Sequence, residues 1–333
     1  MRIVFMGATE LGWNCCRTLL EIGQQVVGIF SIPQQFKISW SPTPVTNVQY
    51  RSFADLADEH SIPLIDVTGK MAEYREHLRE LRPDIIIVVG WYYMLPRSLR
   101  ELAPLGAAGL HASLLPKYRG GAPLVWATIN GETRTGVSFF YFADGVDDGD
   151  LIGQESFEIA LEDDIAALVQ KASRASVNLM KQFVPLLANG TAPRLKQDHT
   201  QATVVPQRKP EDGLIDWQAC SARQAYDWIR AQTRPYPGAF TFLGPEKLTI
   251  WKAGLRQGEN RCSLPAGAIV EDTPEGFGVC CADGQVLSVK EIGLADGELI
   301  TGAEFQARQA SRPAANQWGK FDVEEKPSGL AHA

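Results

Sequence analysis

The sequence predicts an α/β protein in which a doubly wound parallel sheet precedes a small β-barrel, and three observations carry this prediction. An apolar strand over 2–6, a helical pattern over 11–22 and an apolar strand over 25–30 form a β-α-β opening. DIIIVV at 84–89 is apolar throughout, as expected for a central parallel strand buried on both faces. Short strands with glycine turns, typical of a small barrel, are expected at 239–243, 247–253, 267–271, 276–281 and 286–292.

The remaining elements follow the same periodicities. Helices are expected at 53–60, 71–81, 164–187 and 221–232, and strands at 63–67, 136–142 and 151–159. Residues 31–52 contain proline and serine and lack a regular pattern, so the sequence predicts a long loop there. A loop of this length inside a compact domain is usually functional or mobile.

Length and charge limit the organisation and the partners. The 333 residues are enough for two domains, predicted at 1–206 and 207–305, followed by a polar tail at 306–333. A net charge of −7 gives no general attraction to nucleic acid or to anionic lipid. No apolar run approaches the ~20 residues of a membrane span, and the first residues read as a strand rather than a signal peptide. We therefore expect a cytoplasmic protein with no membrane partner.

The cysteines form no recognisable metal or disulfide pattern. None of them belongs to a CxxC unit, so neither a zinc site nor a disulfide framework is indicated. The sequence predicts reduced, mostly buried thiols at Cys15, Cys16, Cys220, Cys262, Cys280 and Cys281.

Three further patterns have competing interpretations. Gly7 and Gly12 lack the GxGxxG spacing of a dinucleotide site, so a close strand-to-helix turn explains them better. The four acids of 143–150 lack the spacing of a calcium loop. The aromatic residues at 91–93 follow a central strand and are equally compatible with ordinary core and with a flat slot for a ring-bearing ligand.

A histidine at the end of the next strand marks the expected site. Small residues at 107–110 lead into His111, followed by a loop bounded by proline and glycine. Open α/β sheets place their chemistry at the carboxyl ends of the strands. The acidic loop at 143–150 can bring a carboxylate back toward His111, so the two segments together predict a polar site at this edge.

At this point the residues resemble the 10-formyltetrahydrofolate-dependent formyltransferase family. The shared motifs are HASLLPKYRG at 111–120, AP at 122–123, NGETRTGV at 130–137, GVDDGD at 145–150 and PYPGAF at 235–240. The resemblance covers the chain to about residue 305. It implies a Rossmann-like catalytic domain, an OB-like second domain, 10-formyltetrahydrofolate as the formyl donor and no metal.

The resemblance also implies roles for individual residues. His111 and Asp147 match the active-site histidine and aspartate of the family. A neutral imidazole can take the proton of an attacking amine, and a neighbouring carboxylate orients it. The segments that hold the folate are matched by Tyr93, Met94, Leu95, Ala143, Asp144, Gly145 and Val146. The loop facing the substrate is matched by Ser113, Leu114, Leu115, Pro116, Tyr118, Arg119 and Gly121.

One position departs from the family pattern. The family reads Asn-x-His, with the asparagine amide donating to the formyl oxygen, whereas this chain has Gly109 two residues before His111. Loss of one oxyanion donor elsewhere costs about 3 kcal/mol. Either His111 or a backbone N–H replaces the amide, or the chemistry is slower. The rival hypothesis is a non-catalytic folate or nucleotide binder.

The acceptor amine is predicted from charge and from the loops. Members acting on nucleotide-linked amino sugars are the expected relatives, although those that modify aminoarabinose carry Arg where this chain has Gly121. Methionyl-tRNA is the alternative acceptor. Its recognition needs a basic loop, and residues 31–52 offer only Lys37 and Arg51. The sequence therefore favours a small amine over tRNA and is compatible with a homo-oligomer.

Overall fold

The computed structural model describes residues 1–333 except 39–40, 42, 257–260, 274–275 and 311–333. Most of the predicted polar tail at 306–333 therefore lies outside the described residues. The chain divides into two compact units. Unit 1 contains residues 1–123, 134–158 and 169–206, and unit 2 contains 124–133, 159–168 and the described residues from 207 onward.

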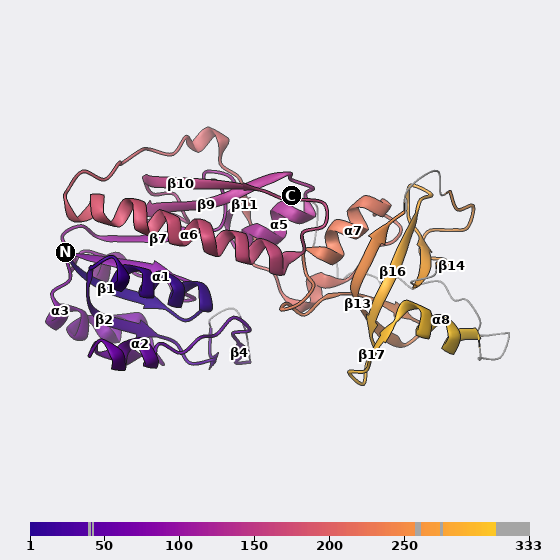
Figure 1. Ribbon diagram of the computed structural model, residues 1–333, viewed down its shortest axis with the longest axis horizontal. Coiled ribbons are helices and arrows are strands. Elements are labelled where there is room, and N and C mark those ends of the chain that lie inside the picture. The colour runs from indigo at the N-terminus through magenta and orange to yellow at the C-terminus, as the bar shows by residue number, and fades with distance from the viewer. Residues whose placement is uncertain (39–40, 42, 257–260, 274–275, 311–333) are drawn as a thin grey trace. The chain divides into compact units, whose positions relative to one another are not determined.

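Unit 1 is built on a seven-stranded sheet in the order β10-β9-β7-β6-β1-β2-β5 (Figure 1). Its parallel strands are β1 (Arg2–Gly7), β2 (Gln25–Ser31), β5 (Leu64–Asp66), β6 (Ile85–Val89) and β7 (Ala107–His111). Strands β9 (Arg134–Tyr141) and β10 (Leu151–Glu158) continue the sheet antiparallel to β7 and to each other. The order reverses beside β1, so the predicted doubly wound, Rossmann-like class is confirmed.

Side chains alternate between the two faces of this sheet, as strand geometry requires. One face packs on a buried cluster that takes Val4 from β1, Val88 from β6, Leu78 from α3 and Leu99 from α4. On the other face the ring of Phe5 lies 5.8 Å from that of Phe53. The helices of this unit are α1 (Glu10–Glu21), α2 (Ala54–Glu59), η1 (Met71–Tyr74), α3 (Arg75–Leu81), α4 (Arg97–Arg100) and α6 (Ile165–Ala188), which begins in unit 2, with the short turn η2 (His199–Gln201).

Two small pairings complete unit 1. The predicted loop at 31–52 contains a short antiparallel pair, β3 (Gln35–Phe36) and β4 (Val45–Thr46). Strand β8 (Arg119–Gly120) pairs in parallel with β11 (Val204–Val205). The second pairing fastens the predicted substrate loop to a segment that lies far along the chain.

Unit 2 contains a curled antiparallel sheet in the order β12-β13-β16-β15-β14, with β17 also paired to β16. The OB-like prediction is confirmed in this form, as a half-barrel. Its core includes Trp217, Leu248, Phe277 and Phe305, all buried. The elements are α5 (Pro123–Ile129), η3 (Pro210–Gly213), α7 (Ala222–Arg230), β12 (Ala239–Leu243), β13 (Glu246–Leu255), β14 (Ile269–Thr273), β15 (Gly276–Cys280), β16 (Val286–Gly293), β17 (Leu299–Thr301) and α8 (Gly302–Ala310).

Strand β17 and helix α8 at the end of this unit are not predicted by the sequence. Strand β17 has three residues, too few for a visible alternation. Helix α8 runs to Ala310, so residues 306–310 are helical although the composition predicted a polar tail from 306 onward. Phe305 anchors the helix, since its ring lies 5.0 Å from that of Phe277 in the core.

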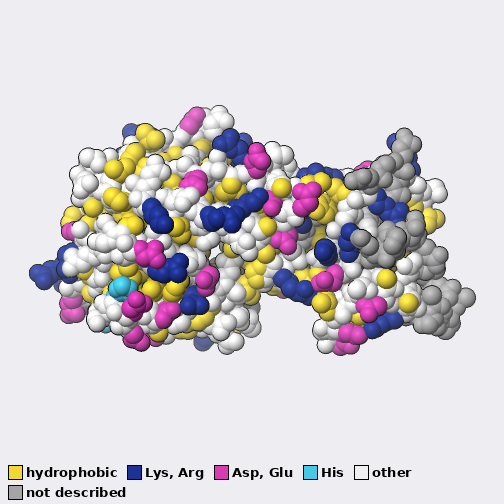
Figure 2. All heavy atoms as spheres, in the orientation of Figure 1, with side chains coloured by type: hydrophobic (Ala, Val, Ile, Leu, Met, Phe, Trp, Pro, Cys, Tyr) yellow, Lys and Arg dark blue, Asp and Glu magenta, His cyan; other side chains and the backbone are white. Residues whose placement is uncertain are grey.

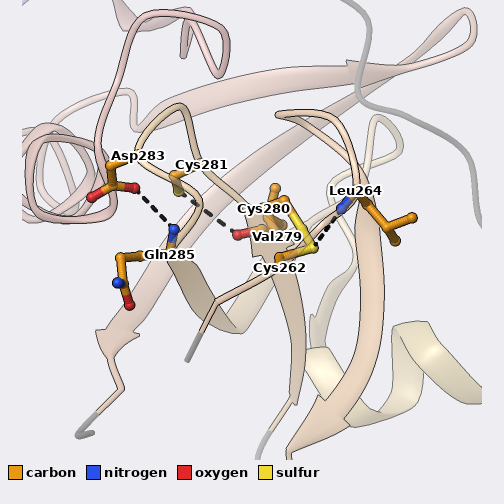
Figure 3. Close-up of a disulfide and its surroundings, with 7 residues drawn as sticks. All are labelled: Cys262, Leu264, Val279, Cys280, Cys281, Asp283 and Gln285. Atoms are coloured by element: carbon orange, nitrogen blue, oxygen red, sulfur yellow. Dashed lines mark hydrogen bonds between the residues drawn. A yellow bond between two sulfur atoms is a disulfide. The ribbon is translucent and has the colours of Figure 1, made fainter. Parts of the chain in front are cut away.

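The cysteine prediction was wrong for one pair. Cys262 and Cys280 form a disulfide with their Cα atoms 6.0 Å apart (Figure 3). The backbone N–H of Cys262 donates to the carbonyl of Gly284 at 2.8 Å, which brings the residue beside the end of β15. A scan for CxxC cannot find such a pair, because the two cysteines are 18 residues apart and meet only through the sheet.

The other four cysteines are free thiols. Cys15, Cys16 and Cys281 are buried, whereas Cys220 is partly exposed. Burial raises the pKa of the Cys281 thiol to about 12, with a further contribution from the charge of Asp283. Burial likewise raises the pKa of Cys15 and Cys16.

Within the described ranges, no helix has the length and apolar character needed to cross a membrane. Among the same residues, no group of three or more His, Cys, Asp or Glu side chains is placed to hold a metal ion.

Candidate functional site

The predicted pair, His111 and Asp147, lies at the carboxyl edge of the sheet in unit 1. His111 is the last residue of β7, and Asp147 lies in the loop between β9 and β10. The distance from His111 Nδ1 to Asp147 Oδ2 is 3.5 Å, and the two side chains are 10% and 24% exposed. The structure thus brings together two residues that are 36 positions apart in the sequence, 147 − 111.

A backbone carbonyl fixes the proton on the histidine ring. His111 Nε2 lies 2.6 Å from the carbonyl oxygen of Tyr118. A carbonyl only accepts, so Nε2 must carry the hydrogen. The neutral ring then has its lone pair at Nδ1, the nitrogen that faces Asp147. A proton taken up at Nδ1 would therefore arrive beside the carboxylate.

Asp147 is held in an unusual backbone conformation. Its φ is 49°, in the left-handed region that non-glycine residues seldom adopt. Such a residue costs about 1–3 kcal/mol and persists where the surroundings over-determine it. One constraint acts on its side chain, because the N–H of Gly120 donates to Asp147 Oδ2 at 2.9 Å.

The first half of the predicted substrate loop is fixed by a buried serine on β9. Ser138 Oγ donates to the carbonyl of Ser113 at 2.7 Å and accepts from the N–H of Leu115 at 3.0 Å. Leu115 is 3% exposed, and the peptide bond from Leu115 to Pro116 is cis. Leu114 packs over Gly136, and a Cβ added at Gly136 would come 2.5 Å from Leu114 Cδ2.

The second half of the loop is fixed by residues 203–205. The N–H of Tyr118 donates to Thr203 Oγ1 at 2.8 Å, and the N–H of Gly121 donates to the carbonyl of Val205 at 3.1 Å. Between them, Arg119 is the first residue of β8 and is 7% exposed. Its side chain is therefore buried against the protein.

The partner of Arg119 is Gln197, which belongs to none of the sequence motifs. Arg119 Nη2 donates to Gln197 Oε1 at 2.6 Å, and Arg119 Nε donates to the same oxygen at 3.2 Å. Gln197 Nε2 donates in turn to the carbonyls of Asp147, at 2.8 Å, and Gly149, at 2.7 Å. A single Gln within a polar stretch carries no sequence signal that it will bond to both Arg119 and the Asp147 loop.

The two segments predicted to hold the folate are joined by one arginine. Arg100, on α4, donates to the carbonyl of Ala143 at 2.6 Å and to Asp144 Oδ1 at 2.5 Å. Helix α4 follows directly after Tyr93, Met94 and Leu95. The structure therefore brings this segment next to Ala143 and Asp144.

Side chains in these two segments differ in exposure. Met94 is 77% and Val146 is 55% exposed, whereas Leu95 is 6% exposed and belongs to the core cluster. Tyr93 packs edge-on to Trp91, with ring centroids 6.1 Å apart, and burial raises the pKa of its phenol. The aromatic run thus supplies core on one side, while Met94 and Val146 remain available to a ligand. Gly145, beside Val146, is also exposed.

Three buried polar atoms in this region lack a hydrogen-bond partner among the described residues. They are the donors Trp91 Nε1 and Arg100 Nε and the acceptor Asp148 Oδ1. Each lies next to one of the two predicted folate segments. Unsatisfied buried polar groups are rare and costly, so a ligand with both donors and acceptors on a flat ring fits this region. The sequence places Trp91 in a run compatible with a ligand slot and Asp148 in the acidic loop, but assigns neither of them to the site.

Gly109 has a steric explanation. A Cβ at this position would lie 2.6 Å from Phe142 Cε1 and 2.6 Å from the carbonyl oxygen of Val88. Gly109 pairs with Phe140 across the β7–β9 ladder. Phe142, one residue past the end of β9, lies on the same face as Phe140, and His111 follows Gly109 on that face. The ring of Phe142 thus fills the space that a side chain at 109 would need.

The fold and the polar pair together define a class: an open α/β sheet with its chemistry at the carboxyl edge, followed by a curled antiparallel sheet. Two family models give the class its identity. Residues 50–184 match the formyl transferase family, and residues 208–310 match the formyl transferase C-terminal domain. The chain belongs to the formyl transferase family.

Known proteins agree with this assignment. A methionyl-tRNA formyltransferase from Desulforamulus reducens is 35% identical over 309 residues, which cover 92% of this chain and 94% of that protein. A methionyl-tRNA formyltransferase from Citrifermentans bemidjiense is 33% identical over 314 residues, 94% of this chain and 95% of that protein. The enzyme prediction is confirmed: this protein is a formyltransferase with a formyl-folate as donor.

A solved structure shows the same fold at lower identity. The N-formyltransferase from Helicobacter canadensis, in complex with folinic acid and dTDP-3-aminofucose, has a TM-score of 0.61 at 19% identity. The similarity covers 86% of this chain and 98% of that one. At this identity the likeness concerns the fold alone.

Proposed function

We propose that this enzyme transfers the formyl group of 10-formyltetrahydrofolate to the amino group of methionyl-tRNA. The observation that carries the choice of acceptor is the 35% identity, over nearly the full length of both chains, to a methionyl-tRNA formyltransferase. The sequence alone favours a small amine, whereas these relatives favour the alternative acceptor, methionyl-tRNA.

The proposed chemistry depends on His111 and Asp147. His111 Nδ1 accepts the proton of the attacking amine, because the carbonyl of Tyr118 already holds the hydrogen on Nε2. Asp147, at 3.5 Å, stabilises the imidazolium that results. Since both side chains are mostly shielded from water, this charge pairing is stronger than it would be at the surface.

The donor is proposed to bind between residues 93–95 and 143–146, where it supplies an activated formyl group. The exposed side chains of Met94 and Val146 offer apolar contact. Trp91 Nε1 and Asp148 Oδ1 offer a donor and an acceptor that the described protein groups leave unsatisfied. These four groups have the mixed character that a pterin ring requires.

The formyl oxygen must be polarised without an amide at residue 109. The ring of Phe142 leaves no room for a side chain there. The remaining candidates are the protonated ring of His111 and a backbone N–H group. We therefore expect slower turnover than an additional well-placed donor would give, by up to about a hundredfold.

The first experiment measures the acceptor directly. Purified protein is incubated with 10-formyltetrahydrofolate and either initiator methionyl-tRNA or a dTDP-linked 3-amino sugar. We expect formyl-methionyl-tRNA, and a loss of more than about a hundredfold in rate for His111→Ala. Equal activity of the wild type and His111→Ala would contradict the assigned chemistry.

A nucleotide-linked amino sugar is the second candidate, and charge favours it. The net charge is −7, and residues 31–52 hold only Lys37 and Arg51 as basic residues. On the face drawn in Figure 2, basic and acidic side chains are interspersed rather than gathered into a basic field. Turnover of the amino sugar without turnover of methionyl-tRNA would decide for this candidate.

A further inference from the structure

The geometry points to Gln197 as a positioning residue that holds Asp147 in register with His111. This inference rests on the proposed roles of His111 and Asp147, and it adds a residue to which neither the motifs nor the relatives assign a function. Gln197 belongs to the segment that follows α6, well outside the motif segments at 111–123 and 145–150.

Gln197 uses both ends of its amide. Its oxygen receives two hydrogen bonds from the Arg119 guanidinium, and its nitrogen donates to the carbonyls of Asp147 and Gly149. The side chain is 5% exposed, so water cannot readily replace these four bonds. A glutamine is the right chemical choice, because this position requires acceptance on one side and donation on the other.

The two carbonyls lie in the part of the loop that most needs support. Asp147 has a φ of 49°, and a Cβ on Gly149 would overlap the carbonyl oxygen of Tyr141. The carboxylate of Asp147 is fixed separately, by the N–H of Gly120. Gln197 thus fixes the backbone of the aspartate, while the residue after Arg119 fixes its side chain.

Arg119 connects the contacts of Gln197 with those of Gly120. Its guanidinium contacts Gln197 Oε1 and lies 3.3 Å from His199 Nδ1, and its own strand carries Gly120. One two-residue strand, β8, therefore reaches Asp147 by two routes. A movement of Gln197 would detach the loop that carries Asp147 from Arg119 in the predicted substrate loop. The carboxylate of Asp147 would then shift relative to His111.

Gln197→Glu separates the two halves of this contact. The glutamate keeps an oxygen facing Arg119 and replaces the donating nitrogen with a second oxygen that faces two carbonyls. We expect kcat to fall by about tenfold to a hundredfold, because a displacement of ~1 Å at a catalytic group has an effect of that size. The KM for 10-formyltetrahydrofolate should change by less than about threefold, since uniform binding is not affected.

Gln232→Glu is the matched control. Gln232 lies in unit 2, is 7% exposed, accepts from Arg208 Nη2 at 2.7 Å and donates to the carbonyl of Trp228 at 2.9 Å. It therefore undergoes the same chemical change at an equally buried position outside the site. We expect its kcat with initiator methionyl-tRNA, or with the dTDP-linked amino sugar if that is the acceptor turned over, to match the wild type.

A double-mutant cycle with Asp147→Asn distinguishes positioning from general damage. If Gln197 acts through Asp147, the loss caused by Gln197→Glu should largely disappear in the Asp147→Asn background. Full additivity, or a wild-type kcat for Gln197→Glu while His111→Ala is inactive, would overturn the inference and leave the proposed function standing. Full activity of both His111→Ala and Asp147→Asn would instead overturn the proposed function.

Discussion

At the scale of single residues, Gly109 and Phe142 act as a pair. Glycine at 109 is required by a ring on the neighbouring strand, whose Cε1 would come 2.6 Å from an added Cβ. The chain therefore has an aromatic wall on the face of the sheet that carries His111. The ring of Phe142, rather than a polar group, fills the space that a side chain at residue 109 would occupy.

Gly109→Asn should be destabilising in this chain. Overpacking a buried position costs about 1–3 kcal/mol, and the carbonyl of Val88 cannot move without disturbing the β6–β7 ladder. Denaturant unfolding of the variant should show a loss in this range. Adding Phe142→Ala should restore part of it, whereas equal losses in the single and the double variant would contradict the pairing.

The site could be predicted from the sequence only where short motifs carry it. His111 and its loop follow a strand within one segment, so strand polarity places them at the carboxyl edge. Gln197 could not be found in this way, because its role depends on a contact with Asp147, which is 50 positions distant. Trp91 could be placed only in a run compatible with either core or a ligand slot, because its unsatisfied ring nitrogen is visible only in the structure. Arg119 was expected in the substrate loop, and the structure shows its side chain buried and bonded to Gln197.

At the scale of elements, α7 depends on one buried carboxylate. Asp227 is 3% exposed and accepts from Arg230 Nε at 2.7 Å and from Arg223 Nε at 2.6 Å. Arg230, itself 5% exposed, also donates to the carbonyls of Ala160, at 3.1 Å, and Asp163, at 2.6 Å. Arg230 therefore fastens the helix to residues 159–168 of the same unit, and Asp227 balances its buried charge.

Asp227→Ala should cost unit 2 about 3–5 kcal/mol, because it leaves the Arg230 guanidinium buried without its countercharge. Chemical denaturation followed by tryptophan fluorescence would measure the loss, since Trp217 and Trp228 belong to this unit. Arg223→Met is the control: its side chain is 48% exposed, and such pairs contribute about 0–1 kcal/mol. Similar losses in the two variants would contradict the account.

The disulfide between β15 and the segment before β14 fixes how many thiols can be alkylated before and after reduction. Unfolded, non-reduced protein should react with iodoacetamide at Cys15, Cys16, Cys220 and Cys281, the four free thiols. Reduction should add Cys262 and Cys280. In the folded protein at pH 8 only Cys220 should react readily, because burial raises the pKa of Cys281 to about 12 and leaves little thiolate. Mass spectrometry of the six labelled sites decides.

Elements were predictable in proportion to the regularity of their pattern. The central strands have long apolar runs, and β6 was expected at 84–89 and observed at Ile85–Val89. The pairs β3–β4 and β8–β11 have strands of two residues, which show no periodicity. They form because tertiary contacts bring the segments together, and a single sequence does not display those contacts.

At the scale of the whole molecule, the two units are interleaved along the chain. Unit 2 takes residues 124–133 and 159–168 from within 1–206, the predicted first domain. The contacts of Arg230 with Ala160 and Asp163 are one reason, and the cation–π contact of Arg208 with Trp126, at 4.9 Å, is another.

A fragment that begins at Gln207 should therefore be less stable than the same residues in the full chain. The fragment would lack the Ala160 and Asp163 carbonyls that accept from Arg230. It would also lack Trp126, against which the Arg208 guanidinium packs in the full chain, where burial lowers the pKa of that guanidinium. Hydrogen exchange at α7 should be faster in the fragment than in the full protein. Equal protection in both would show that residues 207–310 are self-sufficient.

The interleaving also has a consequence for synthesis on the ribosome. Residues 124–133 and 159–168 emerge before the residues beyond 207 with which they pack have been synthesised. Their apolar side chains therefore stay exposed in the nascent chain until then. Folding of unit 1 can begin as soon as α6 has left the exit tunnel, but these two segments are completed only after the last strands of unit 2 appear. Slow translation between 169 and 207 would prolong that exposure, which makes this stretch the interval in which a chaperone has most to protect.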